Sequence, residues 1–224
     1  MSILIQSVTD QGVWEDFLLT HAPQSLFQSW SWGEVQKRLG VKVWRLRFYE
    51  GEVLAGIAQI IKITAKRGTF LHIRHGPVFK EQKREYWKEV LSHIIDLGRL
   101  EKAWFIRIGP LMEDSPANRA LFSSFSLKPA AIHAMDAEYC WVLELDGSEE
   151  QLLANMRKTT RYEIRRAQKL GVTVEKSTDP RNLDDFFQLY KETSHRHGFV
   201  PHEGIREEFE VFAGKNNALL LLGK

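Results

Sequence analysis

The sequence has 224 residues, of which 43% are hydrophobic and 11% aromatic, and its formal net charge at pH 7 is +2. This apolar content supports packed cores and excludes a disordered chain, and the length suits one large domain or about two small ones. Because the charge is nearly balanced, the chain is not a general polyanion binder, and any binding of phosphate or nucleic acid must depend on a local basic patch.

The first part of the sequence alternates between strand and helix signals. Asp10 can cap a helix that begins at Gln11, and Gly51 suits the turn of a β-hairpin. A hairpin, a meander and covering helices together predict an α+β (mixed α/β) fold rather than regular βαβ winding. The expected elements, in chain order, are a strand at 3–8, helices at 11–21 and 31–39, a hairpin within 42–64, a strand at 68–78, a helix at 81–98, a strand at 102–110, a helix at 115–122 and a buried strand at 139–145.

A domain boundary is expected at Asp146-Gly147-Ser148, which divides the chain into domains 1–146 and 147–224. Ser148 can cap a helix that begins EEQLLANM. Because a long apolar edge strand favours aggregation, the final strand ALLLL predicts that the second domain is incomplete in this chain. The other elements expected there are a strand at 172–177 and helices at about 182–196 and 203–213.

Positive charge gathers in the segment NMRKTTRYEIRRAQKLGVTV, from Asn155 to Val174. Six of the fifteen residues from Arg157 to Gly171 are Arg or Lys, and Glu163 is the only acid among them. The segment lacks proline, and Gly171 suits the end of a helix. On one helix over 150–170, apolar side chains could face a core while basic ones form a continuous stripe. The apolar residues are Met156, Ile164, Ala167 and Leu170; the stripe is Arg157, Arg161, Arg165 and Lys169, flanked by Lys158 and Arg166.

Like charges four residues apart disfavour a helix by roughly 0.2–0.5 kcal/mol per pair, so an external anion is expected to offset this cost. Phosphate fits, because arginine binds its oxygens bidentately. The alternative interpretation is a solvated basic face, which is common on helices. The shortage of acidic partners and the excess of Arg over Lys favour the phosphate interpretation.

The same segment resembles the signature of the Fem-type aminoacyltransferases, which form peptidoglycan bridges. That signature reads approximately as a basic residue, then R-x-x-I-R-x-A-x-K-x-G-V. A second motif, Phe-Gln-Ser followed by Trp, matches Phe27, Gln28, Ser29 and Trp32, and weaker matches are RHGPV at 74–78, RIGP at 107–110 and RHGFVPH at 196–202. The signature positions are Arg161, Ile164, Arg165, Ala167, Lys169, Gly171 and Val172.

The resemblance implies two tandem domains related to the GNAT acyltransferase fold, the second apparently incomplete here. It also implies transfer of an amino acid from aminoacyl-tRNA to an amine of a peptidoglycan precursor, either UDP-MurNAc-pentapeptide or a lipid-linked form. Both substrates carry phosphates, which suits the basic stripe. Part of the family's acyl-donor site lies beyond the residues matched here, so residues for the tRNA end are not assigned.

The resemblance also implies which residues bind substrate. In the family, a lysine four residues after the Trp helps hold the precursor; here that place is Gln36, with Lys37 beside it. The expected substrate-binding residues are therefore Trp32, Lys37, Lys158, Arg161, Arg165 and Lys169.

Aminoacyl transfer requires no cofactor, because the ester of aminoacyl-tRNA is already activated, and none is expected. The sequence shows no Ser/His/Asp pattern for a covalent route. Asp136 and Glu138 are candidate acceptors near the amine, with surface charge as the alternative, and the catalytic residues stay unassigned. His195, His197 and His202 lie close in sequence, but no carboxylate or cysteine completes a familiar ligand spacing, so no metal site is expected.

Two other functions remain open from the sequence. An acyl-CoA-dependent GNAT enzyme would normally show a glycine-rich pyrophosphate turn, and no Gly-x-Gly occurs in this chain. A non-catalytic module could instead bind RNA or an anionic glycolipid through the 157–169 stripe, with steep salt dependence and no precursor preference. DNA is not an expected partner.

The compartment follows from the cysteine content and the lack of long apolar runs. Cys140 is the only cysteine, so an intramolecular disulfide is excluded; it lies in the apolar run YCWVLEL and is expected to be buried. The N-terminal residues do not resemble a signal peptide, and the apolar runs are too short to cross a bilayer. We expect a cytoplasmic protein with at most peripheral contact at the inner face of the cell membrane.

Tryptophans offer one further hypothesis. Trp30 and Trp32 could stack on a base or sugar. Six of the seven tryptophans lie in apolar strands or helices, so core packing is the default expectation, with Trp30 the candidate exception.

Overall fold

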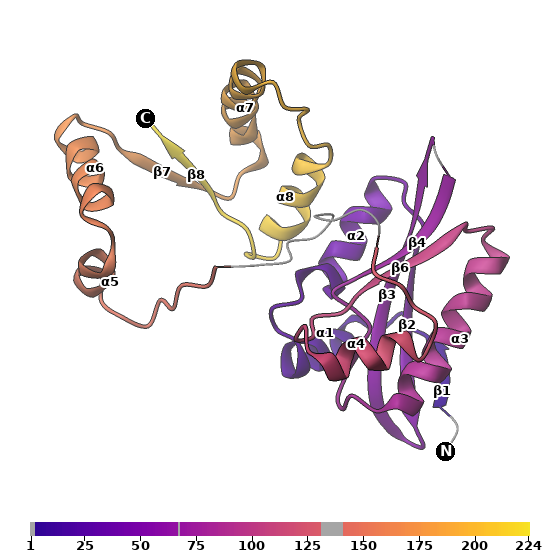
Figure 1. The fold of residues 1–224 in the computed structure, drawn as a ribbon. Coiled ribbons are helices and arrows are strands. Elements are labelled where there is room, and N and C mark those ends of the chain that lie inside the picture. The colour runs from indigo at the N-terminus through magenta and orange to yellow at the C-terminus, as the bar shows by residue number, and fades with distance from the viewer. Residues whose placement is uncertain (1–2, 67, 131–140) are drawn as a thin grey trace. The chain divides into compact units, whose positions relative to one another are not determined.

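The structure, a computed structural model, describes residues 3–66, 68–130 and 141–224. The chain forms two compact units, Met1–Asp136 and Ala137–Lys224, which Figure 1 draws in colours that run along the sequence. The domain boundary expected at Gly147 stays a prediction.

The first unit is built on a mixed sheet with helices on both faces. Its elements, in chain order, are β1 (Ile3–Ser7), α1 (Gln11–His21), the 3-10 helix η1 (Leu26–Gln28), α2 (Trp30–Arg38), β2 (Val43–Glu50), β3 (Val53–Ala65), β4 (Gly68–Arg74), β5 (Val78–Phe79), α3 (Arg84–Leu100), β6 (Phe105–Gly109) and α4 (Pro116–Ser123). The expected order of helices and strands agrees with the structure from β1 to α4, except that the strand expected at 68–78 is divided into β4 and β5. The carboxylate of Asp10 caps α1 by accepting hydrogen bonds from the N–H groups of Gly12 and Val13, as the sequence predicts.

The sheet has six strands in the order β1-β2-β3-β4-β6, with β5 paired to β3 beside this path. Neighbouring strands pair antiparallel, except that β4 and β6 run parallel. Between these two strands the chain passes through α3, which carries it back along the sheet so that β6 can run in the same direction as β4. Side chains alternate along β3, so Ile60 packs in the core under α3, with Trp87 and Ile94, while Ile57 packs in the core under α1, with Trp14.

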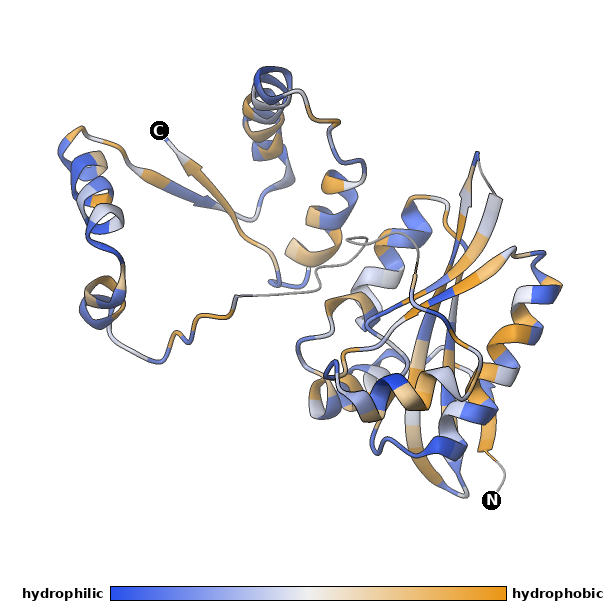
Figure 2. Cartoon of the chain, in the orientation of Figure 1, coloured by the Kyte–Doolittle hydropathy of each residue, from blue (hydrophilic) through white to orange (hydrophobic). Residues whose placement is uncertain are grey.

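The second unit is a smaller arrangement of helices around a two-stranded antiparallel ribbon. A small core joins the ribbon to α7 and α8 through Leu183, Phe209 and Leu220. Figure 2 shows apolar residues along α8 and β8 and mainly polar ones on α6. The elements are α5 (Glu149–Asn155), α6 (Lys158–Lys169), β7 (Val174–Ser177), the 3-10 helix η2 (Pro180–Asn182), α7 (Leu183–His197), α8 (Ile205–Ala213) and β8 (Leu220–Gly223).

The expectation of one helix over 150–170 is wrong. The backbone turns at Met156 and Arg157, whose ψ angles of 157° and 146° are extended, so α5 ends before them and α6 begins after them. Arg157 therefore precedes α6, and only Arg161, Arg165 and Lys169 of the expected stripe share a helix. No proline or glycine marks this corner, so the sequence pattern could not reveal it.

The expected buried strand at 139–145 is also wrong over its described part. Residues 141–145 form no strand, and Trp141 is 97% exposed. Within the described ranges no strand pairs with this run, and an apolar run cannot form a strand without a hydrogen-bonded neighbour. Cys140, Asp136 and Glu138 lie outside the described residues.

Candidate functional site

The Phe-Gln-Ser motif of the first unit lies at the end of η1, with Gln28 buried and Phe27 and Ser29 half-buried. Gln28 is fully buried and its amide spans two strands: Nε2 donates to the carbonyl of Gln59 on β3 at 3.2 Å and to that of Arg74 on β4 at 2.6 Å. Its Oε1 accepts the N–H of Gln59 at 2.7 Å, and its backbone carbonyl accepts the indole N–H of Trp14 at 2.8 Å. Because every polar atom of this amide is bonded to the scaffold, Gln28 positions the motif and does not contact a ligand.

A buried arginine continues this network beneath α2. Arg45 donates from Nε to Oε1 of Gln59 at 2.9 Å and from Nη2 to the carbonyl of Trp30 at 2.8 Å, and its guanidinium lies 3.7 Å from the centre of the Trp30 ring. Gly33 makes this approach possible, because a Cβ there would lie 2.1 Å from the Gln59 amide oxygen and 2.2 Å from Nη2 of Arg45. Trp30 is therefore occupied by protein contacts.

Glu34 compensates the charge of Arg45 and also holds Lys37. One carboxylate oxygen of Glu34 accepts Nη1 of Arg45 at 2.9 Å and Nζ of Lys37 at 3.0 Å. Partial burial raises the pKa of Glu34, but the hydrogen bonds from Lys37 and Arg45 outweigh it and leave the pKa below its ordinary value. Burial likewise lowers the pKa of Arg45 in spite of Glu34.

Lys37, a predicted substrate-binding residue, keeps a side chain that is 47% exposed and lies one turn from Glu34 on α2. An exposed pair of this kind contributes at most about 1 kcal/mol, so a phosphate could displace Glu34 from the ammonium. Gln36 stands at the position where the resemblance places a lysine. It is buried, which indicates a scaffold role.

Trp32, the second predicted residue of the first unit, belongs to an aromatic cluster around Arg74. Its ring meets that of Phe27 edge to face at 5.0 Å, and Phe27 meets His75 at 4.6 Å. The guanidinium of Arg74 lies 3.3 Å from the Phe27 ring centre and 5.5 Å from that of Trp32. The sequence match at RHGPV was the only signal for Arg74, and it did not indicate this cluster.

The basic helix α6 carries the other four predicted residues. Lys158, Arg165 and Lys169 are exposed, and Arg165 and Lys169 lie one turn apart on the same face. No acidic residue follows Glu163 on this helix, and Glu163 contacts Arg166 at 3.7 Å. The face therefore presents cations that an anion could reach without displacing a strong ion pair.

Arg161 is half-buried, in contrast to these three. Its Nη1 donates to the carbonyl of Ala154 at 2.9 Å and also to that of Met156, the last carbonyls of α5. Free carbonyls at a helix C-terminus attract cations, so Arg161 stabilises the corner between α5 and α6. As a member of the expected basic stripe, opposite the apolar face, Arg161 would be solvent-facing, and this is wrong. Its role in phosphate binding stays a prediction.

The apolar positions expected beside the stripe divide in the same way. Met156, Ile164 and Ala167 are half-buried, whereas Leu170 is 71% exposed because it already lies beyond the last residue of α6. The half-buried face of α6 repeats every three residues and consists of Arg161, Ile164 and Ala167.

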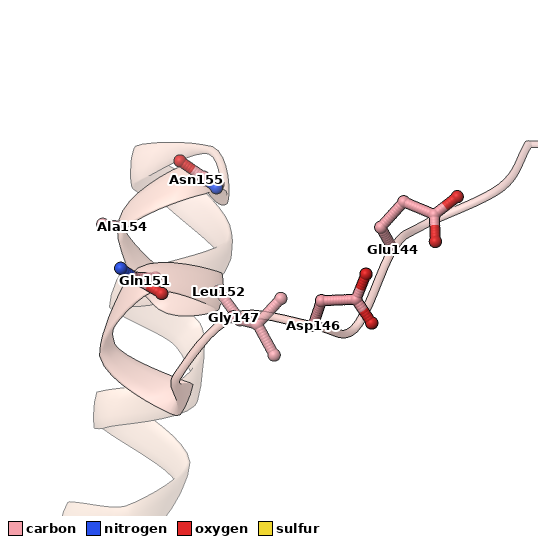
Figure 3. A pocket seen from close by; sticks show the side chains of 7 residues that line it. All are labelled: Glu144, Asp146, Gly147, Gln151, Leu152, Ala154 and Asn155. Carbon is pink, nitrogen blue, oxygen red and sulfur yellow. The ribbon is translucent and has the colours of Figure 1, made fainter.

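A shallow hollow of about 470 Å³ lies between α5 and the segment before it, as Figure 3 shows. Glu144 and Asp146 line it from the loop, and Gln151 and Asn155 line it from α5. None of its seven lining residues is basic, and nearly all are exposed. Its two carboxylates would repel a phosphate, so the hollow is not the site that the basic helix predicts.

Metal ligands and membrane-spanning helices are the remaining features to consider. In the described part of the chain no group of three or more His, Cys, Asp and Glu side chains is placed to hold a metal ion. Within the same ranges, none of the helices combines the length and apolar character needed to cross a bilayer.

Comparison with known proteins identifies relatives over most of the chain. The lipid II:glycine glycyltransferase of Staphylococcus aureus is 26% identical over 197 residues, which are 84% of this chain and 47% of that protein. The crystal structure of FemX superposes on 100% of this chain and 58% of its own, with a TM-score of 0.80 and 22% identity. The chain thus spans about half the length of the curated relatives it matches.

The FemX likeness shows the fold alone, and with the mixed sheet and its covering helices it confirms the mixed α/β fold class expected from the sequence. The family match goes further, because it covers residues 9–120 and 122–204, which include both the buried Phe-Gln-Ser motif and the basic helix. The chain therefore belongs to the FemAB family.

Proposed function

We propose that this protein takes part in peptidoglycan bridge formation by transferring an amino acid from aminoacyl-tRNA to the peptide amine of a cell-wall precursor. The observation that carries the proposal is the FemAB match across both units. The name of the staphylococcal relative supports an acceptor that is a lipid-linked precursor. We further propose that the second domain begins at Gly147 and that the protein acts in the cytoplasm, at the inner face of the membrane.

The reaction is an aminolysis of an ester. The acceptor amine attacks the ester carbonyl, a tetrahedral oxyanion forms, and the ribose oxygen leaves with the proton that the amine loses. The protein must align the amine with the ester and stabilise the oxyanion, and no cofactor is needed.

In this proposal the two sets of predicted residues have separate roles. Trp32 and Lys37 contact the precursor from α2. Lys158, Arg165 and Lys169 contact phosphates of the precursor or of tRNA from α6, with Arg161 fixing the helix that carries them. Their exposure and the lack of competing acids on the outer face of α6 support this assignment.

The test is a transfer assay read by mass spectrometry. The intact protein is incubated with a pool of charged tRNA and either UDP-MurNAc-pentapeptide or its lipid-linked form, and separately with each substrate alone. The proposal predicts that the precursor gains the mass of an aminoacyl residue only when both substrates are present. Binding of tRNA with no precursor binding and no mass gain would contradict it and favour the non-catalytic RNA-binding alternative.

A matched pair of variants connects the assay to α6. Arg165→Glu with Lys169→Glu should lower transfer or precursor binding, whereas Lys191→Glu with Arg196→Glu, an exposed pair on α7, should not. Equal losses in both double variants would show that total charge matters and that α6 has no special role.

A further inference from the structure

An exposed apolar and basic surface lies at one end of the first unit's sheet, away from the motifs used above. β4 and β6 run parallel with Phe70 opposite Phe105, so both strands begin at this end, and β3 ends there because Ala65 pairs with Gly68. α3 also ends there, at Leu100, and the chain then enters β6 (Figure 1). Segments distant in sequence thus share this end of the sheet.

Three large apolar side chains at the junction of α3 and β6 face solvent. Leu100, Trp104 and Phe105 are 77%, 75% and 46% exposed. The expectation that tryptophans in apolar strands are core residues is therefore wrong for Trp104. Trp14 and Trp87, by contrast, are completely buried in the two cores of the same unit.

Trp104 is held in place by the edge of β4. Its backbone N–H donates to the carbonyl of Thr69 at 2.8 Å, and its ring lies over Gly68, where a Cβ would come within 2.7 Å of ring carbons. Phe105 stacks on Phe70 with ring centres 4.6 Å apart and an interplanar angle of 11°. These contacts hold the side chains of Trp104 and Phe105 in place, so the exposed apolar surface is a fixed part of the folded unit.

Positive charge surrounds these side chains, and the nearby acids are already bonded. Glu101 accepts Lys42 at 2.5 Å and Lys62 at 3.1 Å, and Asp96 accepts Arg99 at 2.8 Å. The surface therefore has an excess of cations over carboxylates. We define the Trp104 patch as the apolar residues Leu100, Trp104 and Phe105 with the basic residues Lys42, Lys62, Lys66, Arg99 and Lys102.

We infer that the Trp104 patch docks the first unit on an anionic phospholipid surface. Tryptophan favours the headgroup layer, leucine and phenylalanine favour the acyl boundary below it, and lysines nearby are attracted to anionic lipids. A nucleic acid would use the cations but leave Leu100 exposed. A purely apolar protein partner would have to desolvate the ring of cations, whereas a lipid headgroup layer satisfies both groups at once.

The inference does not depend on aminoacyl transfer, so its test uses vesicles that contain no precursor. The intact chain is mixed with vesicles of phosphatidylcholine alone and with vesicles of equal parts phosphatidylcholine and phosphatidylglycerol, and bound protein is measured by flotation. Binding is expected to the anionic vesicles and to weaken as salt rises, because the charges are screened. Binding to neither vesicle would overturn the inference.

Two pairs of variants locate the contact. Trp104→Ser with Leu100→Ser should lower the partition coefficient by about tenfold or more, whereas Leu19→Ser, at an exposed leucine of α1, should leave it unchanged. Lys102→Glu should lower it by at least about fivefold, and Lys80→Glu, an exposed lysine at the other end of the sheet, should change it far less.

All five substituted side chains are exposed, so folded variants are expected, and circular dichroism of each checks this. Vesicle binding that survives Trp104→Ser with Leu100→Ser but is lost with Arg165→Glu and Lys169→Glu would assign the contact to α6 and overturn the inference. A dimer that Trp104→Ser converts to a monomer, with no vesicle binding, would show that the patch is a self-association face, and this would also overturn it.

Discussion

The buried motif of the first unit and the basic helix of the second unit both match the same family, yet their physical characters are opposite. Gln28 has its amide bonded entirely to the scaffold, and Arg45 is buried under Trp30. Arg165 and Lys169 are exposed and have no strong ion pair within α6. A residue that identifies a family can therefore build the scaffold or contact a ligand, and burial with hydrogen bonding separates the two roles.

This comparison predicts that substitutions in the first motif change stability, whereas substitutions on the outer face of α6 change binding. Arg161 lies between these classes, because it belongs to the basic signature and yet bonds to the carbonyls of α5. Variants at these positions test whether burial and hydrogen bonding separate the two roles.

The largest effect is expected from Gly33→Ala. The new Cβ would collide with the Gln59 amide and the Arg45 guanidinium, so the buried network must move, and the first unit should lose about 3 kcal/mol of unfolding free energy. Urea denaturation followed by tryptophan fluorescence measures this. The matched control is Gly12→Ala in α1, where the Cβ would make only ordinary contact with Asp10 and the helix should be unchanged or slightly more stable. Similar stability for both variants would contradict the network.

The next effect concerns binding. Arg165→Glu with Lys169→Glu should weaken binding of UDP-MurNAc-pentapeptide or tRNA by at least about tenfold and reduce its dependence on salt. The unfolding free energy should stay within about 0.5 kcal/mol of the wild type, because both side chains are exposed. Calorimetric titration and denaturation of the same preparations check both statements. A loss of stability that equals the loss of binding would place these residues with the scaffold.

Arg161→Ala should produce a smaller and mainly structural change. It removes charged hydrogen bonds to the last carbonyls of α5, which should cost about 1 kcal/mol and speed amide hydrogen exchange in α5. Arg165→Ala is the matched control, and it should leave the exchange of α5 unchanged. If both variants exchange alike, the corner between α5 and α6 does not depend on Arg161.

The smallest effect is a pH dependence at Glu34. The pKa of this carboxyl is below its ordinary value of 4.5 in the folded chain, so its stabilising effect is complete above that value and is lost as the pH falls through the lower, folded pKa. Glu34→Gln should therefore lower the unfolding free energy at neutral pH and flatten the acid limb of the stability curve, because the wild type loses the same contribution as the pH falls. Denaturation of the first unit at a series of pH values measures this. An unchanged acid limb in the variant would assign that limb to other carboxyls.

Local signals predicted much of the fold. Asp10 caps α1 where the sequence placed it, and Gly51, with its positive φ, forms the hairpin turn between β2 and β3. The limits of α7 and α8 also agree with the pattern. These features depend on neighbouring residues alone, so the sequence carries their signal directly.

Features that depend on distant contacts could not be predicted in this way. Gln28, Arg45 and Gln59 are polar residues in the core, and hydrophobic periodicity assigns such residues to the surface. The corner at Met156 contains no proline or glycine that would end a helix, and its carbonyl accepts a hydrogen bond from Arg161. The exposed Trp104 lies in an apolar run, and only the sheet register shows that it is at an open end.

The candidate site was predicted in outline. The sequence identified the basic residues of α6, and the structure shows that three of the four predicted there are exposed while one is partly committed to the scaffold. Arg74 and its aromatic neighbours were not predicted as a cluster, because they come from η1, α2 and β4 and meet only in the folded unit.

A calorimetric titration of the chain with UDP-MurNAc-pentapeptide, with UDP alone as the control, tests whether the protein recognises a cell-wall precursor. The proposed function predicts saturable binding of the precursor that is stronger than that of UDP, because the peptide supplies contacts that the nucleotide lacks. Equal affinity for both would show that the protein binds phosphate in general and does not recognise the peptide of the precursor. No binding of this precursor or of its lipid-linked form by a folded chain would contradict the proposed function.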